Sequence, residues 1–276
     1  MSGSTLASTE ALSRNLGRWR IFDCRHDLAR PQLGEQQYRE SHIPGALFAH
    51  LDRDLSAAKT GGNGRHPLPD RGAFIAWLGQ VGLQPADQVV CYDAGNGAMA
   101  ARLWWMLRWA GHAAVAVLDG GFAKWLAEHR PVTGETPRFA HSRYPVRSAL
   151  AAAVDVEEVE AATPSVLLLD ARAPVRFRGE QEPIDPVAGH IPGARNRFSA
   201  ENVQKDGIFK SPAELRKEFE SVLAGRQASE VVHYCGSGVA ACHNLLAMEV
   251  AGLSGGKLYA GSWSEWSADP RRPVAR

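Results

Sequence analysis

One cysteine of this chain stands in a setting that can make its sulfur a nucleophile. Residues 231–234 have the apolar pattern of a buried strand, and residues 241–249 have a helical pattern. The loop between them contains Cys235, Gly236, Ser237, Gly238, Val239 and Ala240. Its glycines let the backbone turn tightly and aim N–H groups inward, and the following helix adds partial positive charge at its start. Both effects favour a thiolate, so we predict a reactive sulfur at Cys235.

The alternative is that Cys235 is a buried, inert thiol beside an ordinary strand-to-helix connection. Two features count against it. The loop has the Gly-x-Gly pattern, and the cysteine stands at the carboxyl end of a predicted parallel strand, where open α/β sheets bind ligands. The other cysteines, Cys24, Cys91 and Cys242, do not open such a loop. We therefore identify Cys235 as the candidate nucleophile.

The elements that position this loop belong to a duplicated sequence. Four short segments of the first half return in the same order in the second half: 23–25 as 170–172, 42–46 as 190–194, 89–93 as 231–235, and 120–125 as 261–266. The segment His-Ile-Pro-Gly-Ala returns without a change. Such a repeat predicts two copies of one domain.

Each half alternates short apolar runs with helical patterns, which predicts βαβ units and a parallel sheet. We expect strands within 88–92, 114–118 and 166–169, and a helix over 100–110. The predicted fold class is α/β, with a small parallel sheet flanked by helices in each of two tandem domains. These domains cover residues 1–135 and 150–276, and a linker without periodicity covers 136–149.

The composition excludes several classes of protein. The 276 residues are 45% hydrophobic and 22% charged, which is ordinary for a globular chain. With a net charge of +1 and no like-charge run, we expect neither a nucleic acid nor a membrane as partner. Four cysteines are too few for a disulfide scaffold and residues 1–20 hold no apolar signal segment, so we expect a cytoplasmic protein with free thiols. No nucleotide-type glycine pattern follows the first strand of either half, so we expect no cofactor.

The repeated Asp-x-Arg and His-Ile-Pro-Gly-Ala segments, together with Cys-Gly-Ser-Gly-Val at 235–239, resemble those of two-domain rhodanese sulfurtransferases. The cysteine loop is similar to that of the 3-mercaptopyruvate sulfurtransferase branch. The resemblance covers nearly the whole chain and implies two rhodanese-like domains, the first non-catalytic and the second catalytic. The repeat agrees, because Asp93 stands in the place of Cys235 and a carboxylate cannot carry a persulfide.

The resemblance also implies a reaction. The Cys235 thiolate would take the sulfur of 3-mercaptopyruvate as a persulfide and release pyruvate, and a thiol acceptor, such as thioredoxin or a small thiol, would remove it. The loop N–H groups, at Gly236, Gly238, Val239 and Ala240, would hold the negative persulfide. Thiosulfate as the donor, or a persulfide carrier without turnover, are the alternatives.

Four further side chains match the family. Arg176 resembles the arginine that binds the donor's carboxylate, although by its sequence alone it reads as a surface residue. Ser237, His66 and Asp52 match a Ser-His-Asp set, in which Asp fixes the imidazole and His polarises Ser. Asp54 is close enough to be a rival for Asp52. Because two members come from the first half, we expect the site between the domains.

Two positions depart from the family pattern. Ala240 stands where the loop usually ends in Thr, which removes a hydroxyl near the sulfur. Ile184 stands where many relatives have a second arginine, so the grip on the donor's carboxylate is weaker unless a residue such as Arg178 compensates. The reaction class is therefore better supported than the donor.

Two other kinds of site fit less well. A Cys-x5-Arg phosphatase loop needs an arginine where this chain has Ala241. A zinc site on Cys235, Cys242 and His243 lacks a second pair of ligands, so we expect no metal.

Overall fold

The computed structural model describes residues 5–162 and 166–276, which form two compact units. The first unit holds residues 5–56, 69–150 and 203–209. The second unit holds residues 57–68, 151–162, 166–202 and 210–276. Residues 1–4 and 163–165 of the two predicted domains lie outside the described residues, and the predicted domain boundaries stay a prediction. The segment 57–68 belongs to the second unit although its neighbours on both sides belong to the first.

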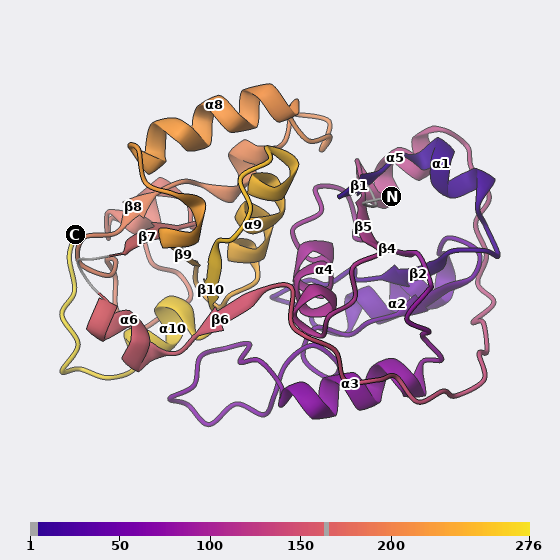
Figure 1. Ribbon diagram of the computed structural model, residues 1–276, viewed down its shortest axis with the longest axis horizontal. Coiled ribbons are helices and arrows are strands. Elements are labelled where there is room, and N and C mark those ends of the chain that lie inside the picture. The colour runs from indigo at the N-terminus through magenta and orange to yellow at the C-terminus, as the bar shows by residue number, and fades with distance from the viewer. Residues whose placement is uncertain (1–4, 163–165) are drawn as a thin grey trace. The chain divides into compact units, whose positions relative to one another are not determined.

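Each unit is built on a five-stranded parallel sheet (Figure 1). The strand order is β1-β5-β4-β2-β3 in the first unit and β6-β10-β9-β7-β8 in the second. The two orders are the same when the strands are matched as copies, as the sequence repeat requires. The predicted α/β class with a parallel sheet in each half is confirmed.

The elements of the first unit, in chain order, are β1 (Leu6–Ala7), α1 (Thr9–Arg14), β2 (Arg20–Asp23), α2 (Leu33–Glu40), β3 (Ala46–Phe48), α3 (Arg71–Gln80), β4 (Val89–Tyr92), α4 (Ala100–Trp109), β5 (Val115–Leu118) and α5 (Gly121–Ala127). Those of the second unit are β6 (Ala152–Val154), α6 (Val156–Ala162), β7 (Leu167–Asp170), α7 (Pro174–Phe177), β8 (Arg195–Asn196), η1 (Ser199–Asn202), α8 (Pro212–Leu223), η2 (Ala228–Glu230), β9 (Val231–Tyr234), α9 (Ala240–Val250), β10 (Lys257–Tyr259) and α10 (Ser262–Trp266). None of the helices in the described part of the chain is long and apolar enough to cross a membrane.

The central strand of the second sheet, β9, is buried at all four residues because helices cover both faces of the sheet. On one face, Val232 and Tyr234 join a core with Trp263 and Trp266 of α10. On the other face, α9 packs on β9 and β10, and α8 packs on α9 (Figure 1). This burial on both sides explains why β9 reads as a continuous apolar run rather than an alternating one, and it fixes where the strand ends.

The repeated Asp-x-Arg segment forms a buried ion pair in both units. Arg25 Nε and Nη2 donate to the two carboxylate oxygens of Asp23, at 3.1 and 2.6 Å, and Arg172 makes the same two contacts to Asp170 at 3.1 and 2.6 Å. Each arginine also donates to a backbone carbonyl, that of Ser41 or Gly189. All four charged side chains are almost fully buried. The Asp-x-Arg segment therefore stabilises each sheet.

The histidine of the repeated pentapeptide is structural as well. His42 Nδ1 lies 2.6 Å from the carbonyl oxygen of Tyr38, and His190 Nδ1 lies 2.8 Å from that of Phe177. Each histidine also forms an isolated antiparallel bridge, His42 with Thr133 and His190 with Ala275. The pentapeptide therefore marks the fold and takes no part in the chemistry at Cys235.

His233, in the middle of β9, leads us to predict how the free energy of unfolding depends on pH. Its side chain is fully buried, and burial lowers its pKa from 6.5 to about 3. The unfolded chain therefore binds a proton below pH 6.5 that the folded chain does not bind until about pH 3, so the free energy of unfolding falls as the pH is lowered through that range. We expect a loss of about 2–3 kcal/mol from this group between pH 7 and pH 4.5.

The measurement is urea unfolding of the native protein and of His233→Leu at both pH values. Since all other titrating groups are shared, the native protein should lose about 2–3 kcal/mol more than the variant. Equal losses in the two proteins would show that His233 does not drive the acid sensitivity.

Candidate active site

Cys235 follows the last residue of β9, at the carboxyl end of the central strand, and its side chain is almost fully buried. The backbone N–H groups of Ser237 and Gly238 donate to its Sγ at 3.4 and 3.1 Å. Gly238 adopts a φ of 75°, and a Cβ there would lie 2.5 Å from the carbonyl oxygen of Ala260. Only glycine fits this position, and the resulting turn aims two N–H groups at the sulfur.

The other loop residues have different places. Val239 is the N-cap of α9, and Ala240 is its first residue. Gly236 lies against the guanidinium groups of Arg65 and Arg176. No hydrogen bond from Gly236, Val239 or Ala240 to the sulfur is present among the described residues, so the N–H cradle of the sulfur is formed by Ser237 and Gly238.

Ser237 is paired with a histidine from a distant part of the sequence. His66 Nδ1 lies 2.8 Å from Ser237 Oγ, and both side chains are 5% exposed. His66 belongs to the segment 57–68, which is part of the second unit. The neighbouring N–H of Arg65 donates to Ser264 Oγ at 3.0 Å, which fixes the segment beside the loop. The structure thus brings together the Ser and the His of the predicted Ser-His-Asp set within one unit.

Two arginines lie against the cysteine loop. Arg176, in the last turn of α7, donates through Nη2 and Nε to Glu182 at 2.6 and 3.1 Å, and through Nη2 to Asp185 at 3.2 Å. Arg65 forms an ion pair with the same Asp185. A Cβ on Gly236 would lie 2.6 Å from Arg65 Nη2 and 3.6 Å from both Nη atoms of Arg176. Both guanidinium groups therefore stand beside the residue that follows the cysteine.

Arg65 is the residue that sequence reasoning missed. In the sequence it stands in a glycine- and proline-rich stretch, which reads as a surface loop, and its only signal is its place directly before His66. Ile184, which replaces the usual second arginine, is 48% exposed. Arg178, the sequence-based candidate to compensate for it, instead pairs with Glu180 at the surface. The second cation near the loop is Arg65.

Glu182, one of the carboxylates that hold these arginines, has a lowered pKa. Burial by itself raises the pKa of Glu182, but hydrogen bonds from Arg176 and from the backbone N–H groups of Asp185 and Ile184 lower that pKa below its ordinary value overall. Arg65 and Arg176 face Glu182 and Asp185, and Glu182 also contacts Arg172 at 3.3 Å. Because Arg172 is itself paired with Asp170, the formal charges of the group cancel. A bound anion must share the guanidinium groups with Glu182 and Asp185.

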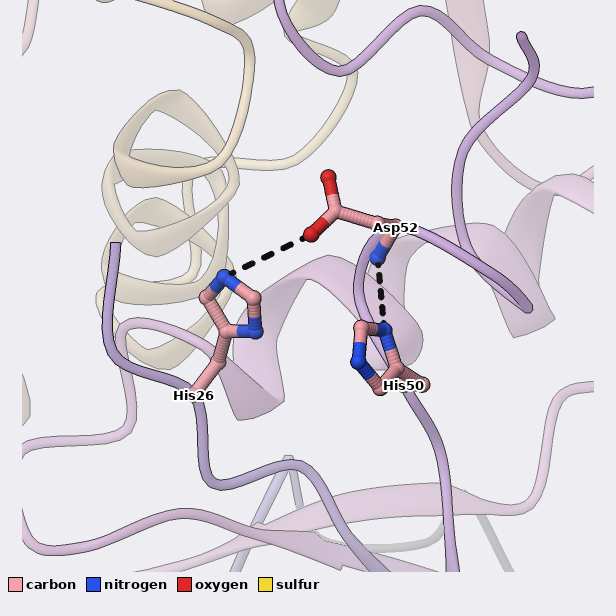
Figure 2. A group of neighbouring side chains, drawn as sticks. All are labelled: His26, His50 and Asp52. Carbon is pink, nitrogen blue, oxygen red and sulfur yellow. Dashed lines mark hydrogen bonds and ion pairs between the residues drawn. The ribbon is translucent and has the colours of Figure 1, made fainter. Parts of the chain in front are cut away.

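Asp52 lies in the first unit, on the chain that follows β3. Its N–H donates to His50 Nδ1 at 3.1 Å, and its Oδ2 lies 3.9 Å from His26 Nε2 (Figure 2). The rival Asp54 has another task, because its Oδ2 accepts the N–H of His50 at 2.8 Å and its carboxylate pairs with Arg53. These contacts fix the turn from which the Asp52 carboxylate projects.

His26, His50 and Asp52 are residue types that bind metals, and their ligand atoms lie within 4.8 Å of one another (Figure 2). His50 argues against a metal. Its Nδ1 accepts the N–H of Asp52, so in the neutral ring the proton is on Nε2. A metal at Nε2 would require that proton to move to Nδ1, which would break the hydrogen bond from the N–H of Asp52. The arrangement suits the positioning of Asp52 better than the binding of an ion.

Residues 8–128 and 155–269 each match the rhodanese-like domain. The chain belongs to the rhodanese-like family. The match to two successive segments confirms the prediction of two tandem rhodanese-like domains.

Three proteins illustrate the similarity of this rhodanese-like chain to others. It is 47% identical over 281 residues to the "Probable 3-mercaptopyruvate sulfurtransferase" of Pseudomonas aeruginosa, a match that covers 100% of this chain and 99% of that protein. It is 33% identical over 256 residues to the thiosulfate sulfurtransferase of Mus musculus, covering 90% and 84%. The structure of 3-mercaptopyruvate sulfurtransferase from Leishmania major superposes with a TM-score of 0.89 at 33% identity, covering 99% of this chain and 77% of that one.

The first rhodanese-like domain carries Asp93 at the position of the cysteine. Asp93 Oδ1 accepts the N–H groups of Gly95 and Gly97 at 3.0 and 2.9 Å, and Oδ2 accepts those of Met99 and Ala100 at 2.8 and 3.2 Å. Four N–H groups of the corresponding loop thus converge on a carboxylate. In both rhodanese-like domains the loop therefore directs backbone N–H groups at the side chain that occupies this position.

The remaining cysteine and histidine of the zinc alternative are engaged with the backbone. Cys242, buried in α9, donates its S–H to the carbonyl oxygen of Gly238 at 3.2 Å. His243 Nδ1 lies 3.1 Å from the carbonyl oxygen of Ser199. Cys242 thus stabilises the turn at Gly238, and His243 contacts η1.

Proposed function

We propose that this protein is a sulfurtransferase that moves a sulfur atom from 3-mercaptopyruvate to a thiol acceptor through a persulfide on Cys235. The observation that carries the proposal is the Cys235 sulfur held by the N–H groups of Ser237 and Gly238, beside the Ser237–His66 pair. The sequence similarity to 3-mercaptopyruvate sulfurtransferases over the full chain supports the same conclusion.

In the first step, the Cys235 thiolate attacks the sulfur of the donor. A bond forms between the two sulfur atoms, and the donor's C–S bond breaks, leaving its electron pair on carbon as the enolate of pyruvate. The enolate takes up a proton to become pyruvate. We assign the delivery of that proton to the Ser237 hydroxyl, because the backbone N–H of Ser237 contacts the sulfur and its hydroxyl is hydrogen-bonded to His66, which can replace the proton.

In the second step, the sulfur of a thiol acceptor attacks the outer sulfur of the persulfide and returns Cys235 as a thiolate. The N–H groups of Ser237 and Gly238 point at the Cys235 sulfur, so they stabilise the thiolate that attacks in the first step and is returned in the second. We propose thioredoxin or a small thiol as the acceptor and the cytoplasm as the compartment. All four cysteines are free thiols, which supports the cytoplasm as the compartment.

The charges near the loop favour a donor with a single negative charge. Arg65 and Arg176 are balanced by Glu182 and Asp185, so the site offers directed N–H donors without excess positive charge. The carboxylate of 3-mercaptopyruvate can share the guanidinium groups at a distance from its sulfur. Thiosulfate concentrates two negative charges next to the reacting sulfur, and no cationic side chain lies in the loop itself.

The test of the donor is the ratio of kcat/KM for 3-mercaptopyruvate and thiosulfate at one acceptor concentration and one pH. We expect 3-mercaptopyruvate to be preferred. A ratio in favour of thiosulfate would overturn the donor but leave the sulfurtransferase, whereas a persulfide that forms without turnover with either donor would indicate a carrier.

Replacing the arginine of α7 should weaken the use of 3-mercaptopyruvate. Loss of a charge-assisted contact to the donor's carboxylate costs about 1.5–3 kcal/mol, so Arg176→Ala is expected to lower kcat/KM by at least about tenfold. The matched control is Arg178→Ala, two residues along, whose side chain is exposed and pairs only with Glu180 among the described residues. If Arg176→Ala matched the native protein, Arg65 alone would hold the donor, and Arg65→Ala would then carry the whole loss.

A further inference from the structure

Ser262, the first residue of α10, has a backbone conformation that is unfavourable for its residue type. Its φ is 57°, in the left-handed region that side chains with a Cβ rarely adopt. The other residues of this kind in the described chain are His129 and Ala224, and both lie at exposed ends of helices, where such a φ commonly terminates a helix. Ser262 instead begins a helix and is fully buried. Strain at a buried position needs a compensating contact.

The duplicated sequence supplies an internal comparison. Gly121 stands at the matching position of the first unit, and its φ is 55°. A Cβ there would lie 2.9 Å from Asp93 O and from two atoms of Gly95, so the first unit requires glycine. The second unit uses the same backbone conformation but has a serine in it. The serine side chain must therefore contribute something in the second unit that the first unit does without.

The contribution is a hydrogen bond to the backbone of the cysteine. Ser262 Oγ accepts the N–H of Cys235 at 3.1 Å and donates its own proton to the carbonyl oxygen of Tyr259 at 2.9 Å. The bond to Tyr259 directs the hydroxyl proton away and leaves the lone pairs for Cys235. The N–H of Cys235 is buried, and Ser262 is its partner.

The remaining contacts of this segment are common to both units. Trp263 N–H donates to Cys235 O at 3.0 Å, and in the first unit Phe122 N–H donates to Asp93 O at 2.9 Å. The next residue, Ser264 in one unit and Ala123 in the other, repeats the pattern one position further along. The second unit differs by the hydroxyl of Ser262. This hydroxyl contacts the backbone N–H of Cys235, the candidate nucleophile.

We infer that Ser262 is a positioning residue for sulfur transfer: its hydroxyl fixes the Cys235 N–H and so orients the thiolate toward the N–H groups of Ser237 and Gly238. The inference rests on the proposed role of Cys235 as the sulfur carrier. The strained backbone is the cost of placing a hydroxyl at this point. Stability and reactivity are therefore opposed at Ser262.

The test is Ser262→Gly, which removes the hydroxyl and also relieves the strain. We expect the thermal unfolding temperature to stay the same or rise. The single-turnover rate of persulfide formation on Cys235 should fall about threefold to tenfold with little change in the KM for 3-mercaptopyruvate, as for the loss of one neutral hydrogen bond. The pH midpoint for alkylation of Cys235 by iodoacetamide, located by peptide mapping, should rise.

Two further variants complete the design. Ala224→Gly relieves a similar φ at the end of α8, away from the cysteine loop, and should gain stability without a change in rate. Ser262→Ala keeps the Cβ but loses the hydroxyl, so it should be as slow as Ser262→Gly and less stable. A native rate and alkylation profile in Ser262→Gly, or a native rate in Ser262→Ala, would overturn the inference. Alkylation needs no sulfur donor, so it reports on Ser262 even if 3-mercaptopyruvate proves not to be the substrate.

Discussion

Cys235→Ser is expected to abolish sulfur transfer and leave the fold intact. Oxygen replaces sulfur with little change in volume at a buried position, so packing should be retained, but a serine hydroxyl cannot carry a persulfide. The measurement pairs steady-state transfer with the intact mass of the protein after treatment with 3-mercaptopyruvate. The native protein should gain one sulfur atom, and the variant none.

The control for this result comes from the repeat. Ala171 stands in the second unit where the first has Cys24, so Cys24→Ala installs a residue that the same backbone already accepts. This variant should keep full transfer and still gain one sulfur. Peptide mapping that placed the sulfur on Cys24, Cys91 or Cys242 would refute the assignment of Cys235.

His66→Ala and Ser237→Ala should each slow the release of pyruvate by about 100-fold or more, because positioned proton transfer contributes at least that factor. Since the imidazole acts through the hydroxyl 2.8 Å away, the double variant should be little worse than the slower single one. The comparison is kcat for pyruvate release in the three variants. Losses that multiply would mean that the two side chains act independently.

A matched control is His129→Asn, which replaces an exposed histidine with a residue that tolerates its φ of 52°. It should leave kcat unchanged. Asp52 lies in the first unit, and its place as the third member of the set stays a prediction.

Much of the fold could be predicted because its signals are local. The buried strands β4 and β9 are continuous apolar runs, and the repeat multiplies the weight of every such signal. The cysteine loop could be predicted from the sequence for the same reason, since a strand, a Gly-x-Gly turn and a helix follow one another within about twenty residues.

The remaining features depend on contacts that no local pattern encodes. The segment 57–68 reads as a loop of the first half, and only its contacts assign it to the second unit. Arg65 therefore had no visible function until Gly236 and Asp185 were found beside it. Ser262 is harder still, because a serine in the sequence carries no sign of its φ. The Asp-x-Arg and His-Ile-Pro-Gly-Ala segments show the reverse case: they are the strongest sequence signals in the chain, yet they hold the sheets together and do no chemistry.

The carboxylate of Asp93 has a consequence for the stability of the first rhodanese-like domain. A loop that converges several N–H groups on one point creates a positive potential that persists after the nucleophile is gone. A neutral side chain without an acceptor at position 93 would leave those N–H groups facing one another without a partner. The aspartate supplies the acceptor for these N–H groups and so holds the loop in one conformation. The conformation of this loop in the first domain therefore depends on a buried carboxylate, and Asp93→Ala should destabilise that domain more than a substitution at its surface.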